Sequence, residues 1–178
     1  MTRDSQKARV YKCDARLPKT PVFPSLAAVE EFYKTITSSK WWEYHAHPRR
    51  QFPNGIRVER GRLGAGRAYT GSALVTLGTQ AQDMSSVLHE LAHMMSGPGA
   101  HHGPEFVQNF QKLIRRWWSR EVADQYKRDC KELKVRSSRK SPPGAAMVRR
   151  AVVRDPKETE ASMEDEIEAA HADQVKPT

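Results

Sequence analysis

The chain has 178 residues, of which 38% are hydrophobic, and it carries a net charge of +9. This length allows one domain of ordinary size with a tail, and the hydrophobic content is low for a chain that is folded throughout. No apolar run approaches the ~18 residues that span a bilayer, which argues against a membrane protein. The polar N-terminus lacks the apolar core of a signal peptide, so we expect a cytoplasmic protein.

The charge is distributed unevenly along the chain. Residues 1–136 contain 23 Lys and Arg against 13 Asp and Glu, a net charge of +10, whereas residues 137–178 contain 7 against 8, a net charge of −1. A basic body of this kind is compatible with binding to nucleic acid or another polyanion. It is also typical of a solvated surface that keeps a protein soluble, and charge alone does not decide between the two.

The N-terminal third is expected to contain one clear helix. Val10-Tyr11 is compatible with a short strand or a docked arm, and three prolines between positions 18 and 24 exclude a helix before Ser25. Ser25 is a suitable N-cap, and apolar residues recur every three or four positions over residues 26–37, which predicts an amphipathic helix. Residues 38–53 are predicted to be irregular.

Short β-type runs separated by glycine follow. The candidate strands are residues 56–59, 67–70 and 73–77, and they predict a small, mostly antiparallel sheet of about three strands. The run at 73–77 is a candidate edge for binding an extended peptide by β-strand addition. Together with the helices on either side, these strands predict an α+β fold.

A helix with the pattern HExxH comes next. Its apolar residues predict a helix from about Met84 to Met95, which contains His89, Glu90 and His93. Two histidines four residues apart lie on one face of a helix, so both imidazoles can bind a single Zn²⁺. The glutamate after the first histidine is placed to act as the general base toward the open position of that metal.

A catalytic zinc needs a third protein ligand, which must come from beyond this helix. A Ser-Gly-Pro-Gly turn ends the helix and a Gly-Pro pair begins the next one, so the chain reverses between them. His101, His102 and Glu105 are the candidates in this segment. We favour His102, because the rigid start of the next helix would determine its direction, and His101 and Glu105 remain alternatives.

Two further helices and a tail complete the chain. Apolar spacing predicts one helix after Gly103-Pro104 and another over residues 121–133, with a basic exposed side. From residue 137 the composition becomes linker-like, basic and then acidic, which predicts a disordered tail over residues 137–178 and a folded domain over residues 1–136. The only two cysteines are far apart in the sequence and are expected to be reduced thiols.

The sequence resembles known zinc proteins around the histidine motif. The HELAH pattern at residues 89–93 and the HGPxF pattern at residues 102–106 are similar to the arrangement in SprT-like zinc metalloproteins. Residues 1–136 resemble more closely the zinc metallohydrolases of actinobacteria and mycobacteriophages, including the opening residues 1–6 and Arg9-Val10-Tyr11. These opening residues carry no obvious chemistry, so their match is informative about kinship.

The resemblance implies a minimal zincin fold in which His89, His93 and His102 hold zinc and Glu90 is the catalytic acid and base. The implied function is that of a zinc-dependent metallohydrolase, and in particular a metallopeptidase that acts on proteins or peptides. The sequence has no evident Met-turn, which separates it from the metzincins. It also has no obvious zinc ribbon or other cysteine-rich module, which separates it from a full SprT-like protein.

Two other classes of function remain open from the sequence. One is a DNA-associated protein, for which Arg49-Arg50 and the Arg-Arg-Trp-Trp run at residues 115–118 are the motivating features. The other is a regulatory binding protein with a structural or relict zinc site. A peptidase would also need a donor for the developing oxyanion, and Tyr69, Tyr44 and nearby arginines are candidates. The sequence does not determine the oligomeric state.

Overall fold

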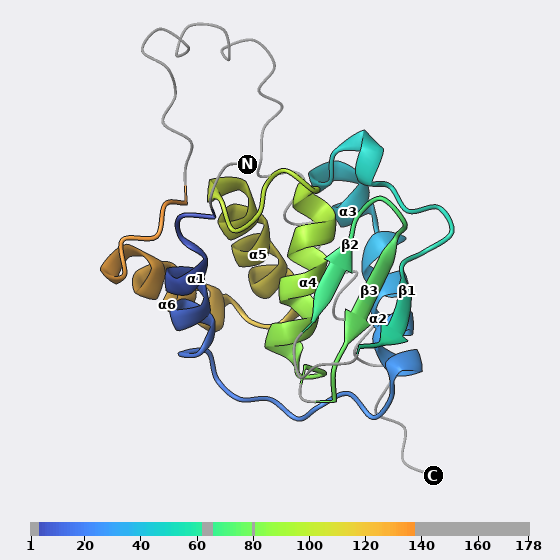
Figure 1. The fold of residues 1–178 in the computed structure, drawn as a ribbon, viewed down its shortest axis with the longest axis horizontal. Coiled ribbons are helices and arrows are strands. Elements are labelled where there is room, and N and C mark those ends of the chain that lie inside the picture. The colour runs from blue at the N-terminus through green and yellow to red at the C-terminus, as the bar shows by residue number, and fades with distance from the viewer. Residues whose placement is uncertain (1–3, 62–65, 80, 138–178) are drawn as a thin grey trace, which may run out of the picture. The chain divides into compact units, whose positions relative to one another are not determined.

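The structure is a computed structural model that describes residues 4–61, 66–79 and 81–137, all within a compact unit spanning residues 1–139. The tail predicted over residues 137–178 lies outside the described residues apart from its first position. The described residues form six α-helices, one short 3-10 helix and three strands, so the predicted α+β class is confirmed (Figure 1). None of these helices is both long and apolar enough to cross a membrane.

The sheet is mixed, not mostly antiparallel as predicted. Its spatial order is β1 (Arg57–Arg60), β3 (Leu74–Leu77) and β2 (Arg67–Tyr69). β1 pairs with β3 in parallel and β2 pairs with β3 antiparallel, so that Val58 and Ala68 both lie opposite Val75. The predicted peptide-binding edge is therefore the central strand. The alternation of side chains predicts strands but contains no information about which strands pair, which is why this prediction was wrong.

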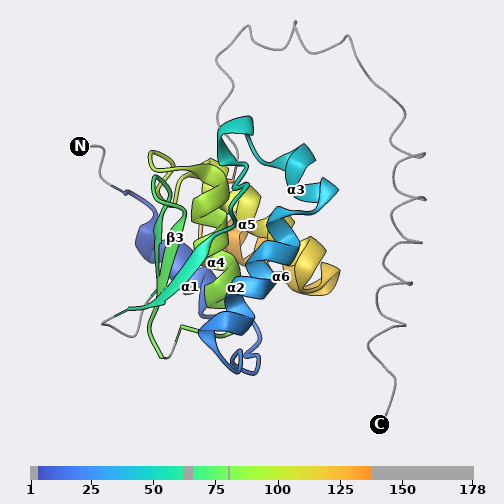
Figure 2. The same ribbon diagram turned by 90° about the vertical axis from the view of Figure 1, so that its right-hand side faces the viewer.

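Helices α2 (Leu26–Thr37) and α4 (Met84–Ser96) pack beside the sheet, α2 against β1 and α4 against β2 (Figure 2). The predicted helix over residues 26–37 is confirmed, and the Ser25 hydroxyl accepts a first-turn amide at 3.1 Å. The buried hydroxyl of Tyr33 donates to the carbonyl oxygen of Val87 at 2.7 Å. This bond joins α2 to α4 two residues before His89, the first residue of the HExxH pattern.

The N-terminal segment forms helix α1 (Lys7–Asp14) instead of the predicted strand or arm. Its Val10 and Cys13 side chains are fully buried, and the helix packs against α6 (Arg120–Glu132), where Cys130 is also buried. Both thiols are free. A helix of eight residues with two buried side chains has too little apolar periodicity to be predicted from the sequence.

The segment after α2 is also more regular than predicted. Ser39 caps a short helix, α3 (Lys40–His45), by accepting a first-turn amide at 3.2 Å, and a 3-10 turn follows at Pro48–Arg50. His45 stacks on Trp41 with ring centroids 4.5 Å apart, and its Nδ1 lies 2.8 Å from the Trp41 carbonyl oxygen. This histidine therefore has a packing role.

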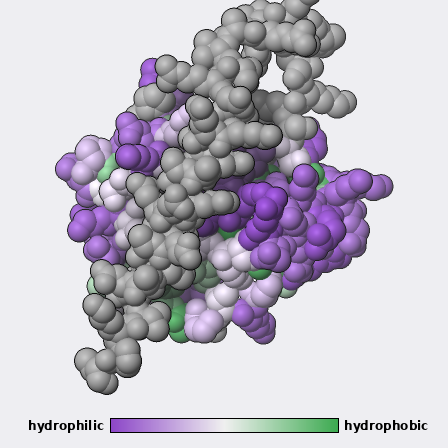
Figure 3. Space-filling view, turned by 180° about the vertical axis from the view of Figure 1, so that it is seen from behind, coloured by the Kyte–Doolittle hydropathy of each residue, from purple (hydrophilic) through white to green (hydrophobic). Residues whose placement is uncertain are grey.

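Helix α5 (Pro104–Trp117) packs against both α4 and α6, as the apolar face predicted after Gly103-Pro104 requires. Its Phe106, Phe110 and Leu113 side chains are fully buried. The described part of the rear surface is mostly hydrophilic, with small hydrophobic areas between (Figure 3). The apolar core thus lies between the helices and the sheet and supports α4 on both sides.

Candidate metal centre

Three histidines converge where α4 meets the start of α5. His89 and His93 lie one turn apart on α4, and His102 precedes α5 by two residues. One ring nitrogen from each lies within 4.8 Å of the others, and the Nε2 atoms of His89 and His102 are 3.3 Å apart. Three imidazoles at this separation could hold a metal ion, because their nitrogen atoms can point at one common position.

The turn between α4 and α5 decides which histidine faces this position. α4 ends at Gly97, whose φ of 85° suits glycine, and the amide of Gly103 donates to the carbonyl oxygen three residues earlier at 2.8 Å. Between them His101 adopts a left-handed φ of 44° and is exposed, whereas His102 turns inward and is only 5% exposed. The favoured candidate therefore joins the group, and the alternatives His101 and Glu105 do not.

Burial favours the neutral form of two of these histidines, His93 and His102. It lowers the pKa of His93 to about 2, with His89 and His102 adding smaller effects in the same direction. Burial also lowers the pKa of His102, although its hydrogen bond to Asp4 acts in the opposite direction. The neutral imidazole is the form that binds metal, so the site does not have to release a proton from these two rings at neutral pH.

Two carboxylates that the sequence interpretation missed orient two of the histidines. Asp14 Oδ2 lies 2.9 Å from Nδ1 of His89, and Asp4 Oδ2 lies 2.5 Å from Nδ1 of His102. An ionised carboxylate can only accept a hydrogen bond, so Nδ1 carries the proton in each ring and the Nε2 lone pair is left for a metal. The opening residues, in which the sequence shows no chemistry, therefore help to build the site.

Gln6 holds the segment that carries Asp4 in place. Its side chain is 2% exposed, and Nε2 donates to the carbonyl oxygen of His102 at 2.6 Å and to that of Arg136 at 3.1 Å. Gln6 Oε1 accepts the amide of Arg136 at 3.0 Å. One side chain thus joins the N-terminal segment, the turn that carries His102 and the segment after α6.

Replacing Asp14 or Asp4 by Asn should weaken metal binding by about 10- to 100-fold, because outer partners of this kind set the tautomer and basicity of ligating histidines. Competition with a chromophoric chelator measures the affinity. Asp124→Asn is the control, because this carboxylate lies on α6 in a half-exposed pair with Arg115 at 3.7 Å. Unchanged affinity in both Asp14→Asn and Asp4→Asn would show that these hydrogen bonds do not act on the metal site.

Glu90 lies beside His89 and against the edge of β2. Burial raises the pKa of this carboxyl, whereas His89, the Ala68 amide that donates to it and Arg67 lower the pKa by smaller amounts. Gly66 packs directly on the carboxylate. A Cβ atom at this position would lie 2.6 Å from Glu90 Oε1 and 2.7 Å from Glu90 Cγ. The absence of a side chain at position 66 therefore makes room for Glu90, and no motif in the sequence pointed to it.

The phenols predicted as oxyanion donors differ in their surroundings. Tyr44 is 86% exposed on α3, where its ring packs against His45. Tyr69 is 40% exposed on β2, and the Arg67 guanidinium lies 6.0 Å from its ring centroid. Tyr11 on α1 contacts the rings of two of the three histidines. It was not among the candidate oxyanion donors predicted from the sequence.

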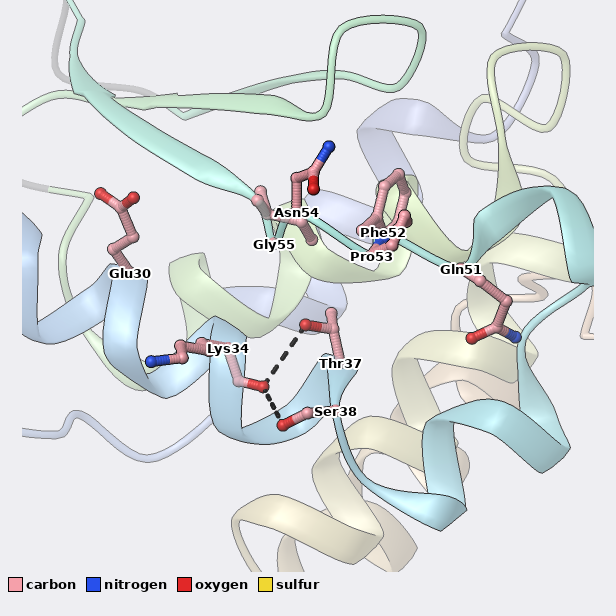
Figure 4. A pocket seen from close by; sticks show the side chains of 10 residues that line it. Glu30, Lys34, Thr37, Ser38, Gln51, Phe52, Pro53, Asn54 and Gly55 are labelled. Atoms are coloured by element: carbon pink, nitrogen blue, oxygen red, sulfur yellow. Dashed lines mark hydrogen bonds between the residues drawn. The ribbon is translucent and has the colours of Figure 1, made fainter.

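A cavity of about 420 Å³ lies elsewhere, between the second half of α2 and residues 51–56 (Figure 4). Its two hydroxyl groups are engaged by the helix itself, because Thr37 and Ser38 both donate to the Lys34 carbonyl oxygen, at 3.4 and 2.6 Å. None of the three clustered histidines lines it. We assign this cavity no function.

No protein-family model, no curated protein and no solved structure matches the chain. The three histidines, the two carboxylates behind them and the buried Glu90 are therefore the basis for any functional interpretation. Their arrangement combines three imidazole nitrogen donors with an adjacent carboxylate that is able to accept a proton.

Proposed function

We propose that the protein is a zinc-dependent metallohydrolase with a minimal zincin-like fold, and that its substrates are proteins or peptides. One observation carries this proposal: three histidines from α4 and the following turn converge, two of them buried and His93 half-buried, and Glu90 lies next to the first of them. Three neutral imidazoles are the donor set of a catalytic zinc site that keeps one position for water or substrate. The resemblance of the HELAH and HGPxF patterns to zinc metallohydrolases supports the same assignment.

Each residue has a distinct role in the proposed reaction. A bound Zn²⁺ would supply Lewis acidity, which polarises a carbonyl and lowers the pKa of water. Glu90 accepts the proton of the attacking water as the new C–O bond forms, and returns it to the amine as the C–N bond breaks. The raised pKa of Glu90 favours this exchange, because a carboxyl with a pKa closer to neutral both accepts and releases a proton more readily.

The outer edge of β2 is the proposed place for the substrate backbone. β3 occupies one side of β2, and no described strand pairs with its other side. The Ala68 amide donates to Glu90, so this free edge faces the carboxylate on α4. An extended peptide that paired with Arg67–Tyr69 would pass beside Glu90 and the three histidines. This replaces residues 73–77, the central strand, as the candidate binding edge.

Metal-dependent hydrolysis tests the proposal directly. The purified protein is incubated with casein and with a mixture of fluorogenic peptides, before and after removal of metal by 1,10-phenanthroline. We expect cleavage that disappears with the chelator and returns on addition of Zn²⁺. A zinc-loaded protein that cleaves neither substrate would favour the alternative of a binding protein with a structural site.

Replacing Gly66 by Ala should lower turnover by about 100-fold, because a displacement of about 1 Å in a catalytic group has an effect of this order. The new methyl group cannot be accommodated without moving Glu90. Zinc content should stay that of the wild type, since the three atoms nearest to the added Cβ all belong to Glu90. Gly71→Ala is the matched control, because a Cβ there meets nothing within 4 Å. Equal loss of activity in both variants would contradict a specific effect on Glu90.

The nucleic-acid alternative rests on net charge. In the Arg-Arg-Trp-Trp run, Arg115 pairs with Asp124, and the Arg116 guanidinium lies 5.7 Å from the Trp117 ring centroid. The Trp117 ring itself packs edge-on against Phe32 and Trp41. A side chain used in this way is part of the packing between helices, so no specific contact favours DNA binding as a second function.

A further inference from the structure

Helix α1 presents one face to the metal centre. Lys7, Tyr11 and Asp14 are spaced four and three residues apart, so they lie on the same side of the helix. Asp14 on this face bonds to His89. The Tyr11 ring stands edge-on to His102 with centroids 5.1 Å apart, and it lies 5.7 Å from the ring of His89. Tyr11 therefore contacts two of the three proposed metal ligands.

The Tyr11 side chain is partly exposed to solvent and is not part of the apolar core. It is 46% exposed, whereas Val10 and Cys13 on the same helix are fully buried. The Tyr11 hydroxyl is a hydrogen-bond donor on a ring that contacts His89 and His102.

We propose that Tyr11 is the oxyanion donor of the site, with its hydroxyl directed at the oxygen of the scissile carbonyl. This inference rests on the proposed hydrolase function. When the oxygen of water bonds to the carbonyl carbon, the π electron pair moves to the carbonyl oxygen and the proton of the water goes to Glu90. Tyr11 donates a hydrogen bond to that oxygen without transferring its own proton, and the hydrogen bond strengthens as negative charge develops.

The contacts of the three tyrosines favour Tyr11 over the two predicted from the sequence. Tyr11 contacts His89 and His102, whereas Tyr44 packs against His45 on α3. Tyr69 is on the strand proposed to pair with the substrate backbone, where its ring lies near Arg67 and not against a histidine ring. Lys7 adds a positive charge beside Tyr11, with Nζ 5.4 Å from the ring centroid, which also favours an anionic oxygen at this position.

Binding of acetohydroxamic acid to the zinc-loaded protein tests the proposal without a known substrate. This probe chelates zinc and presents an anionic oxygen to nearby donors. Tyr11→Phe should weaken its binding by about 10- to 100-fold, the loss expected for one hydrogen bond to a charged group. Zinc content by elemental analysis and the melting temperature should not change, because the ring and its contacts remain. Tyr44→Phe is the matched control, because Tyr44 packs against His45 on α3, and it should bind the probe as the wild type does.

Several results would overturn the assignment. They are unchanged hydroxamate binding in Tyr11→Phe, a loss that appears in Tyr69→Phe instead, loss of zinc in Tyr11→Phe, or a zinc-loaded wild type that does not bind the probe. Where turnover is measurable, Tyr11→Phe should lower kcat by about 100- to 1,000-fold with little change in KM. Weakened hydroxamate binding in a protein without hydrolase activity would show that Tyr11 donates to an anionic oxygen at the metal and would refute the proposed hydrolase function. Active hydrolysis that Tyr11→Phe does not change would refute the assignment of Tyr11 and leave the proposed hydrolase function standing.

Discussion

Replacing Glu90 by Gln should abolish hydrolysis while leaving the metal in place. The amide has nearly the same shape as the carboxylate and still accepts the Ala68 amide, but it cannot take a proton from water. The expected loss in kcat is about 100- to 10,000-fold, the usual contribution of a general base. Glu90 does not belong to the histidine group, so zinc content measured by elemental analysis should equal that of the wild type.

Glu43→Gln provides the matched control for this experiment. Glu43 is exposed on α3, and the same change of one charge there should leave both turnover and zinc content unaltered. Full activity of Glu90→Gln with zinc bound would remove Glu90 from the mechanism. Loss of zinc in that variant would instead make Glu90 part of the ligand set.

Replacing His102 by Ala should remove most of the bound zinc. Two of the three imidazoles remain, and they lie on one helix without the ligand that closes the site from the following turn. Because zinc binds the folded protein, this variant should also lose the stabilisation that zinc confers. That stabilisation is about 4 kcal/mol when free zinc exceeds the dissociation constant 1,000-fold. Elemental analysis and denaturant unfolding with and without zinc measure the two effects.

His101→Asn is the control for His102→Ala. Asparagine tolerates the left-handed conformation that His101 adopts, so the turn should keep its shape. The exposed His101 ring is not part of the histidine group, and full zinc content is therefore expected. If His101→Asn lost zinc and His102→Ala retained it, the third ligand would be His101 and not His102.

Local patterns in the sequence predicted the helices that have a strong apolar stripe and are capped by neighbouring residues. The helix over residues 26–37 and the helix that carries His89, Glu90 and His93 have strong apolar stripes and clear caps at Ser25 and Gly97. In both cases the hydrogen bonds that start or end the helix are made by residues within a few positions.

The predictions that were wrong required knowledge of distant contacts. α1 is short, and it is held by packing on α6 and by the Gln6 bonds to His102 and Arg136, which are 96 and 130 residues away. The position of β3 at the centre of the sheet depends on its pairing with β1, which no turn specifies. Alternation along a strand is the same for a central strand and for an edge strand with one buried face.

By itself, the sequence determined the chemistry of the histidine motif. A four-residue spacing on a helix brings His89 and His93 to one face whatever the rest of the chain does, and places Glu90 beside them. The tertiary structure decided three other features: the choice of His102 over His101, the carboxylates of Asp4 and Asp14 behind the rings, and Gly66 against Glu90. These depend on a single left-handed φ and on contacts between segments that only folding brings together, so no local pattern along the chain contains them.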